Sequence, residues 1–234
     1  MSVLILRLKG PQQSWGTSSR YRTREAGTEP SKSGVIGLLA AAQGRSRASE
    51  LTDLLELGFG VRADQPGRLM VDYHTARVRG AKNSSLSSRH YRVDAAYTAA
   101  ISGPDSLVAA LAEAIDSPRF PLYLGRRACP ASVDLLGGVL PGDDVEATLR
   151  DVDATPWLAS DWYRREAAKV VYLPLARDAC ADEVGETVQD VPVSFDPRHR
   201  LYDARAVVRP APVMIENPDG VDVKDDFFQT VKEG

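Results

Sequence analysis

The order of periodic segments in the first 124 residues constrains the fold of this chain most strongly. Val3–Lys9 alternates with a period of two, which places its leucines on one face and predicts a strand whose second face is partly basic. A helix is predicted to begin near Ser33, because apolar residues then recur at helical spacing up to a stop signal at Gly44. The chain therefore opens with a strand, a loop and an amphipathic helix.

Further segments continue this alternation. Strands are predicted at 59–63, 69–73, 95–101 and 118–124, with a turn at 65–67 and a second helix that starts at Pro104. Apart from one additional strand between the two helices, this is the order strand, helix, strand, strand, helix, strand, which is the split βαβ order of ferredoxin-like and RNA-recognition-motif folds. We therefore predict an α+β fold with a ferredoxin-like domain over residues 1–133.

One segment inside that domain has a different character. Residues 75–94 contain five lysines and arginines against a single acid, Asp94, and almost no apolar side chains. A segment like this within a compact domain is either a functional protrusion or a disordered loop.

The chain changes character again near residue 134, where acidic residues become frequent. Short strands are predicted at 170–175, 191–195 and 206–208. They indicate a small β-rich C-terminal subdomain over residues 134–215, set off by the glycines and proline between 137 and 142. Residues 216–234 are predicted to be an acidic tail.

The net charge of −3 conceals an uneven distribution. Residues 1–100 carry 15 Lys and Arg against 8 Asp and Glu, whereas residues 101–234 carry 14 against 24. A split of this kind points to an anionic partner for the basic half.

Several classes of protein are disfavoured by what the sequence lacks. Two cysteines cannot make a disulfide framework or a four-thiolate zinc site, and three scattered histidines add no metal-binding spacing. We also find no hydrolase motif, no secretory signal and no apolar run long enough to cross a bilayer. We expect a cytoplasmic protein without metal, cofactor or membrane contact.

The segment before the first helix superficially resembles a phosphate-binding loop. Its Lys-Ser pair precedes a helix, but the spacing is wrong by one and the second glycine is missing. What remains is a helix N-terminus at Ser31–Ser33 that offers backbone N–H groups and a lysine to an anion. A serine cap on a structural helix is the equally available interpretation.

Binding of nucleic acid is the strongest functional indication. Residues 1–47 hold eight lysines and arginines against two acids, and the basic segment 75–94 adds tyrosine and histidine. Cations neutralise phosphates and aromatic rings stack on unpaired bases. Two positions stay open: Trp15 could stack on a base or plug the sheet, and Arg126-Arg127 could reach a ligand or belong to a solvated loop.

Four stretches of sequence, in order, carry a resemblance to a known family. They are Lys9-Gly10-Pro11-Gln12-Gln13-Ser14-Trp15-Gly16, then Pro30-Ser31-Lys32-Ser33-Gly34-Val35-Ile36-Gly37, then Tyr123-Leu124-Gly125-Arg126-Arg127-Ala128-Cys129-Pro130, and finally Asp190–Pro197 with Arg200, Tyr202 and Arg205. Over about residues 2–209 the chain resembles the Cas5-type RAMP subunits of type I-E CRISPR Cascade complexes.

That resemblance implies a ferredoxin-like RAMP domain with a projecting β-hairpin thumb, which would fall at about residues 75–94. It also implies a subunit that holds the 5′ handle of the guide crRNA and caps the complex. The implied protein partners are the backbone subunit and the large subunit, with target DNA as an indirect partner. Some relatives in type I-C systems cut repeat RNA, whereas the type I-E branch does not.

The first hypothesis is therefore a non-catalytic RNA-binding subunit without catalytic residues of its own. Its candidate RNA contacts are Lys9, Gln13, Trp15, Arg22, Arg24, Ser31, Lys32, Ser33, Arg77, Arg79, Lys82, Arg89, His90, Tyr91, Arg126 and Arg127. The second hypothesis is a metal-independent endoribonuclease that uses Lys82, His90 and Tyr91. The third is a structural scaffold whose basic surface meets an acidic protein.

Overall fold

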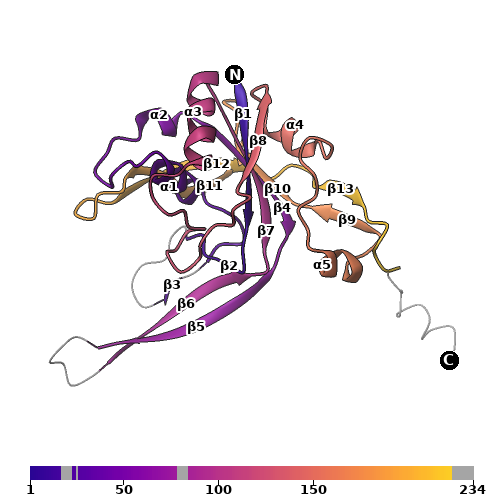
Figure 1. Cartoon of the computed structure of the whole chain (residues 1–234), viewed down its shortest axis with the longest axis horizontal. Coiled ribbons are helices and arrows are strands. Elements are labelled where there is room, and N and C mark those ends of the chain that lie inside the picture. Colours follow the sequence, from indigo (N-terminus) through magenta and orange to yellow (C-terminus); the bar gives the residue numbers. More distant parts are fainter. Residues whose placement is uncertain (17–22, 25, 78–83, 223–234) are drawn as a thin grey trace.

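A large antiparallel β-sheet with few helices forms the body of the protein. We describe a computed structural model over residues 1–16, 23–24, 26–77 and 84–222. The seven strands lie in the spatial order β11 (Glu186–Ser194), β12 (Leu201–Val208), β10 (Leu175–Asp178), β4 (Gly58–Gln65), β7 (Ala96–Gly103), β1 (Ser2–Lys9) and β8 (Leu136–Pro141), and each pairs antiparallel with its neighbours (Figure 1).

Both faces of this sheet are buried near strand β1, which lies between β7 and β8. Leu4, Leu6 and Leu8 are fully buried and pack with α1 (Lys32–Ala42), α2 (Thr52–Leu55) and α3 (Asp105–Asp116) in the larger core. The alternate residues Val3 and Ile5 pack in a second core with Trp157 and residues of α4 (Val145–Arg150). The second face, predicted to be partly basic, is therefore apolar and covered over half of the strand.

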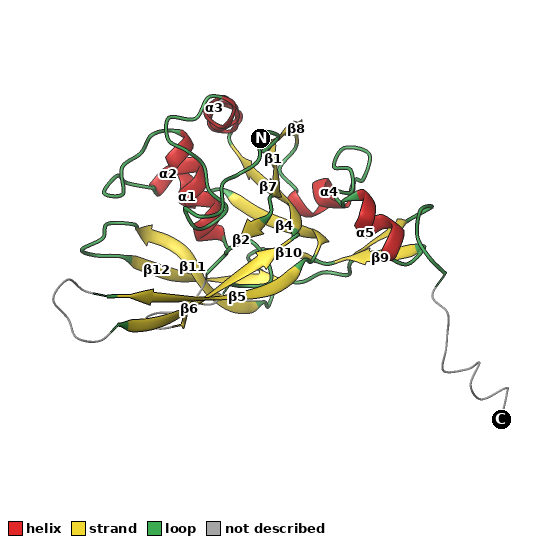
Figure 2. Ribbon diagram, turned by 60° about the horizontal axis from the view of Figure 1, so that its bottom comes forward, coloured by secondary structure: helices red, strands yellow, loops and turns green. Residues whose placement is uncertain are grey.

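The helices separate accordingly in space. Figure 2 shows α1, α2 and α3 grouped together, apart from α4 and α5 (Asp161–Glu166). Beside α5 lies a separate two-stranded sheet of β9 (Val170–Leu173) and β13 (Val213–Glu216).

The predicted first helix is confirmed, and its two ends follow from the local sequence. The side chain of Ser31 caps the N-terminus by accepting a hydrogen bond from the Gly34 amide at 3.3 Å. At the other end, Gly44 takes a left-handed φ of 78°, and the amides of Gly44 and Arg45 donate to the carbonyls of Ala41 and Ala40. This is a Schellman motif, which needs a residue without a side chain at the left-handed position.

Gly34 in this helix lets the fully buried indole of Trp15 lie against the backbone. A Cβ at position 34 would come within 2.7 Å of the Trp15 ring. We therefore expect Gly34→Ala to lower the free energy of unfolding by about 1–3 kcal/mol, as overpacking does. Gly37→Ala is the matched control, because its Cβ would only reach Phe195 at 3.4 Å and alanine favours helix. Chemical denaturation of both variants measures this, and equal stabilities would contradict it.

A long β-hairpin leaves the body of the protein at the end of β4. Strands β5 (Arg68–Ala76) and β6 (Ser85–Val93) pair along nine residues and project well beyond the sheet (Figure 1). The predicted strands at 59–63 and 69–73 are both present, as parts of β4 and β5, and β5 pairs with β6. The hairpin also begins earlier than the predicted protrusion at residue 75. Short strands β2 (Gln12–Gln13) and β3 (Thr23–Arg24) line the other edge of β6.

The predicted strand at 118–124 is absent from the described structure. This segment is a loop with one bridge between Tyr123 and Pro130, and its prolines at 118 and 121 lack the N–H that a ladder requires. The outer position beside β1 belongs to β8. Its Gly137 has no side chain, and a Cβ there would lie 2.6 Å from Ile5 Cγ2. The glycines predicted to separate two domains thus form an edge strand.

The division predicted at residue 134 does not follow the sheet. Strands β8, β10, β11 and β12 all come after that residue and all belong to the seven-stranded sheet. The predicted strand 170–175 is interrupted at Pro174, so that β9 and β10 join different sheets. The strands at 191–195 and 206–208 are present as parts of longer strands, β11 and β12. Of the predicted tail, residues 223–234 lie outside the described residues.

Within the described residues, we find no helix with the length and apolar character needed to cross a bilayer.

Candidate nucleic-acid interface

A groove of about 580 Å³ lies beside helix α1. Its floor is one side of α1. We call residues 195–202, the turn between β11 and β12 with the first residues of β12, one wall of the groove, and the loop 120–127 the other wall. The groove is lined by small residues of α1 or its N-terminus, by four arginines and by aromatic rings. These include Ser31, Ser33, Gly34, Gly37, Arg45, Arg47, Arg127, Arg200, Phe120, Tyr123, Phe195 and Tyr202.

The charge of the groove is one-sided. Among the described residues that line it, none is acidic. Arg45 is held by a two-fold ion pair with Asp53, which raises the pKa of the guanidinium and offsets its charge. Arg47, Arg127 and Arg200 are exposed and form no ion pair with any described residue. These three cations make the groove suited to an anion.

Aromatic rings accompany these cations. Phe195 and Tyr202 stand edge to face across the β11–β12 turn, with ring centroids 6.5 Å apart. Phe120, on the facing loop, is 47% exposed. Exposed rings next to arginines are the side chains on which unpaired bases stack.

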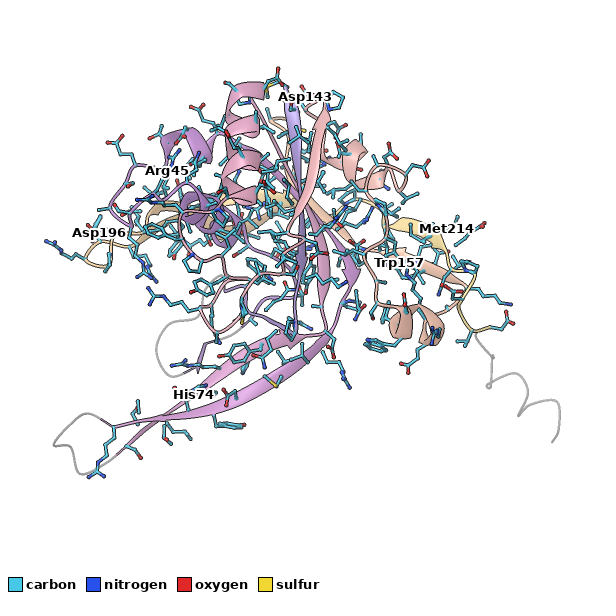
Figure 3. The ribbon with its side chains drawn as sticks, viewed as in Figure 1. Arg45, His74, Asp143, Trp157, Asp196 and Met214 are labelled. Atoms are coloured by element: carbon cyan, nitrogen blue, oxygen red, sulfur yellow. The ribbon has the colours of Figure 1, made fainter. Side chains whose placement is uncertain are left out.

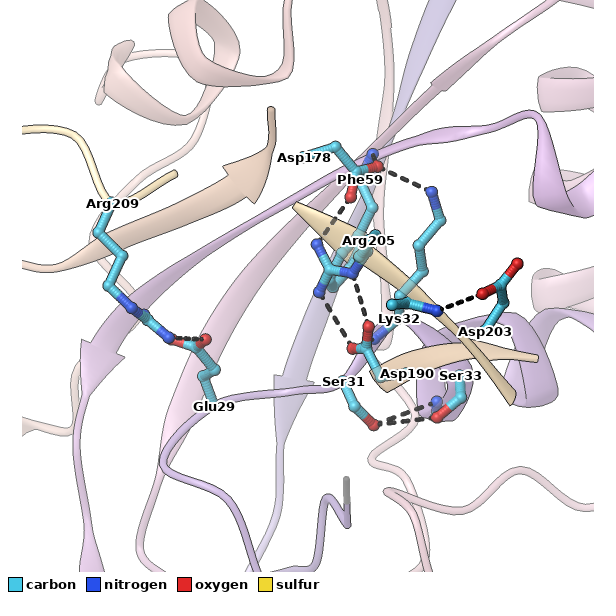
Figure 4. Close-up of polar contacts among 12 residues, drawn as sticks. Glu29, Ser31, Lys32, Ser33, Phe59, Asp178, Asp190, Asp203, Arg205 and Arg209 are labelled. Carbon is cyan, nitrogen blue, oxygen red and sulfur yellow. Dashed lines mark hydrogen bonds and ion pairs between the residues drawn. The ribbon is translucent and has the colours of Figure 1, made fainter. Parts of the chain in front are cut away.

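The N-terminus of α1 faces an anion, but that anion is part of the protein. The amide of Lys32 donates to Asp190 at 2.7 Å, and its ammonium pairs with Asp178 at 2.8 Å (Figure 4). The Gly34 amide is used by the Ser31 cap. The hypothesis that Lys32 and these amides hold phosphate is therefore not supported by their geometry. Ser31 and Ser33, although largely buried, do line the groove.

Gln13 and Trp15 are structural residues. Gln13 has no exposed surface, donates to the carbonyls of Leu8 and Ala95, and accepts from Trp15 Nε1 at 2.9 Å. Trp15 is equally buried, and its indole packs in the core in this structure, as expected of a plug over the sheet.

Tyr91 and Arg126 form the root of the hairpin. Tyr91 is 3% exposed, and the Arg126 guanidinium lies 4.9 Å from the centre of its ring. Arg126 also donates to the carbonyl of His90 at 3.1 Å, which receives a second hydrogen bond from Ser14 at 3.0 Å. Tyr91 is thus unable to stack on a base in this structure, and Arg126 fixes the hairpin to the body.

The remaining predicted contacts lie apart from the groove or outside the described chain. Lys9 is exposed at the end of β1 beside Asp134, and Arg89 and His90 are half-buried on β6. Arg77 is exposed at the outer end of β5. Figure 3 places His74 along this hairpin, far from Trp157. Arg22, Arg79 and Lys82 lie outside the described residues, as does the side chain of Arg24.

The segment that leads into α1 is held by a buried phenol. Tyr97 donates to the carbonyl of Thr28 at 2.8 Å, and burial raises the pKa of Tyr97 to about 12. The phenol therefore remains a donor at any physiological pH. Across the described residues, we find no group of three metal-ligating side chains that could hold an ion.

Comparison with known proteins identifies the family. The family model described as CRISPR-associated protein (Cas_Cas5) matches residues 3–208. The chain belongs to the Cas5 family. Among curated relatives, this Cas5 protein is 35% identical over 199 residues to CRISPR system Cascade subunit CasD of Escherichia coli strain K12, across 76% of this chain and 88% of the relative. The resemblance read from the sequence motifs is confirmed.

Solved structures agree with this assignment of the Cas5 fold. A chain of a CRISPR RNA-guided surveillance complex superimposes with a TM-score of 0.72 at 28% identity, covering 99% of this chain and 98% of that one. The crystal structure of a Cas protein gives a TM-score of 0.67 at 36% identity, covering 94% and 98%.

Seven residues that line the groove were not predicted from the sequence to contact RNA, namely Arg45, Arg47, Phe120, Tyr123, Phe195, Arg200 and Tyr202. Arg200 and Tyr202 stood in the motif that carried the family resemblance, and that motif was the available signal. Arg45 and Arg47 follow the helix stop at Gly44, and no pattern in the sequence places them beside residue 200.

Proposed function

We propose that this Cas5 protein is a non-catalytic subunit of a type I-E Cascade complex that binds the 5′ handle of the guide crRNA and caps the complex in the cytoplasm. The observation that carries the proposal is the groove beside α1, which combines exposed arginines with aromatic rings and has no acidic lining residue in the described chain. Phosphates would lie on Arg47, Arg127 and Arg200, and unpaired bases on the rings. Recognition of single-stranded RNA commonly takes this form.

The finer fold assignment supports the same proposal. The elements β1, α1, β4, β7, α3 and β8 alternate as strand, helix, strand, strand, helix, strand, and their strands lie in the order β4, β7, β1, β8. We take this unit to be the ferredoxin-like RAMP domain. The β5–β6 hairpin is then the thumb, with Arg77 at its outer end, whereas Arg79 and Lys82 lie outside the described residues.

The proposed protein partners are the backbone subunit and the large subunit of Cascade, with target DNA as an indirect partner. The match to a Cascade subunit and to a chain of a surveillance complex supports an assembled role.

The geometry disfavours the alternative of an endoribonuclease. His90 and Tyr91 are neighbours on strand β6, so their side chains point to opposite faces of the hairpin and do not converge on one phosphate. Tyr91 is also buried. Site-specific cleavage of repeat RNA by the pure protein in EDTA, lost in His90→Ala, would replace our proposal with this alternative.

The proposal predicts salt-dependent binding of single-stranded RNA that carries the 5′ end of the cognate guide. Arg77→Ala with Lys82→Ala is expected to weaken that binding and to lower the slope of log affinity against log salt by about 0.7 for each lost phosphate contact. Fluorescence anisotropy of a labelled RNA across a salt series measures both quantities.

Arg165→Ala with Lys169→Ala is the matched control, because it removes two exposed positive charges near β9, on the far side of the molecule. Absence of salt-dependent binding by the unmodified protein would refute the proposed function. Equal effects of the two double variants on RNA binding would refute only the role of the thumb and would leave the proposed function intact.

A further inference from the structure

Four charged side chains from four segments of the chain meet beneath the N-terminus of α1 (Figure 4). Arg205 on β12 donates to Asp190 on β11 at 2.6 Å and to Asp178 at the end of β10 at 2.7 Å. Lys32 completes the group through its ammonium to Asp178 and its amide to Asp190. We call these four residues the α1–ribbon clamp, where the ribbon is the β11–β12 hairpin.

The clamp is withdrawn from solvent. The side chains of Asp190, Lys32 and Arg205 are exposed by only 1%, 8% and 12%. Charges at such depth contribute little net stability even when paired, and their role is often to fix a geometry. The Arg205 guanidinium also lies 5.3 Å from the centre of the Phe59 ring, and Asp178 accepts from the Phe59 amide, so that the clamp is anchored on β4 as well.

The ribbon needs such an anchor. It joins the rest of the sheet through β10, where two residue pairs, Arg177 with Val208 and Asp178 with Val207, connect the strands, and the Ala179 amide adds one hydrogen bond to the carbonyl of Ala206. The far end of the ribbon carries Phe195, Arg200 and Tyr202, which form one wall of the groove. The position of that wall relative to the floor on α1 therefore depends on contacts between ribbon and helix.

The clamp supplies the polar part of those contacts. Helix α1 has no acidic residue in its own first turn, and Asp190, 158 positions later, provides the carboxylate at the Lys32 amide. Five hydrogen bonds join the clamp residues, and the two from Lys32 tie β11 and β10 to the start of the helix that forms the groove floor.

We infer that the α1–ribbon clamp positions the wall of the RNA groove without contacting RNA itself. This inference rests on the proposed function of the groove. Lys32 is then a positioning residue, held by two aspartates, and not a ligand of phosphate.

Lys32→Met in the full-length protein tests this inference with the same labelled guide RNA. We expect the affinity for the RNA to fall about tenfold. This is the effect of losing about one charge-assisted hydrogen bond to the RNA when the wall moves. The salt slope is expected to stay unchanged, because no phosphate contact is removed, whereas a direct contact would lower the slope by about 0.7. Hydrogen exchange of residues 195–202 is expected to accelerate in the free protein.

Two further variants keep the test interpretable. Asp178→Asn retains the shape of the side chain and an acceptor for the Phe59 amide, so we expect this variant to fold. Its affinity for RNA should fall by less than that of Lys32→Met, again with an unchanged salt slope. Lys169→Met removes an equal charge from the exposed ion pair with Asp222. It is expected to change neither the affinity for RNA nor the hydrogen exchange of residues 195–202.

A lowered salt slope in Lys32→Met would overturn the inference, as would unchanged affinity together with unchanged exchange at 195–202. In both cases binding by the unmodified protein would leave the proposed function intact. Loss of RNA binding in the unmodified protein would instead refute the proposed function.

Discussion

Exchanging Arg127 and Arg200 for glutamate is expected to weaken binding of single-stranded RNA by about 10²–10⁴-fold. The two guanidiniums lie on opposite walls of the groove, are exposed, and form no ion pair with any described residue. Each would donate to phosphate in a charge-assisted hydrogen bond of about 1.5–3 kcal/mol. The salt slope should fall by about 0.7 for each arginine.

Anisotropy titrations of Arg127→Glu, Arg200→Glu and the double variant measure this effect. Arg165→Glu with Lys169→Glu serves as the control, because it makes the same change in net charge at a surface near β9. If the control weakens binding as much as the groove variant, the effect comes from overall charge, and the groove is not the site. Circular dichroism verifies that all variants remain folded.

Arg62→Ala is expected to lower the free energy of unfolding by about 3–5 kcal/mol, because it leaves a charge buried without its partner. The side chains of Arg62 and Asp64 have no exposed surface and are joined at 2.7 Å. Arg62 also donates to the carbonyls of Leu149 and Thr155, at 2.7 and 2.8 Å, and so ties β4 to the segment after α4.

The cause of this loss can be separated from the loss of packing. Burial raises the pKa of the Asp64 carboxyl, and Arg62 opposes that rise, so the variant should raise the pKa further. When a carboxyl has a higher pKa in the folded state than in the unfolded state, lowering the pH protonates it first in the folded state. Its destabilising effect on the folded state therefore shrinks as pH falls. The difference in the free energy of unfolding between Arg62→Ala and the unmodified protein should therefore be smaller at pH 5 than at pH 7.

Two comparisons complete the experiment. Arg209→Ala breaks an ion pair with Glu29 in which the arginine is 46% exposed, and we expect a loss of no more than about 1 kcal/mol. Replacing both buried partners, as Arg62→Met with Asp64→Leu, should cost less than Arg62→Ala alone. A double variant at least as unstable as the single one would show that the unpaired charge is not the cause.

The local elements of the fold were predictable because their signals lie within a few residues. The alternation in Val3–Lys9 predicted the strand β1, and the Ser31 cap with Gly44 bounded the first helix. The edge strand was not predictable in the same way. The apolar segment 118–124 contains two prolines that exclude it from a ladder, whereas the glycine-rich β8 is accepted because Ile5 leaves no room for a side chain opposite it.

The candidate site was likewise predictable only in part. The sequence indicated a basic, RNA-facing N-terminal half and a projecting basic segment, and Arg127 lies in the groove as a candidate contact. It assigned Lys32, Gln13, Trp15 and Tyr91 to RNA as well, although the structure buries all four. Residue type and charge do not reveal burial when the covering residues come from another part of the chain.

By itself, the sequence determined the family and the alternation of helices and strands, and its charge distribution indicated an anionic partner, since each of these signals lies in contiguous motifs, local periods or composition. Only the tertiary structure decided which cations remain available to that partner. Lys32 is held by Asp178 and Asp190, 146 and 158 positions away, whereas Arg200 reaches the groove because the β11–β12 ribbon folds back beside α1. Such pairings are set by the register of distant strands, and charge in sequence does not specify them.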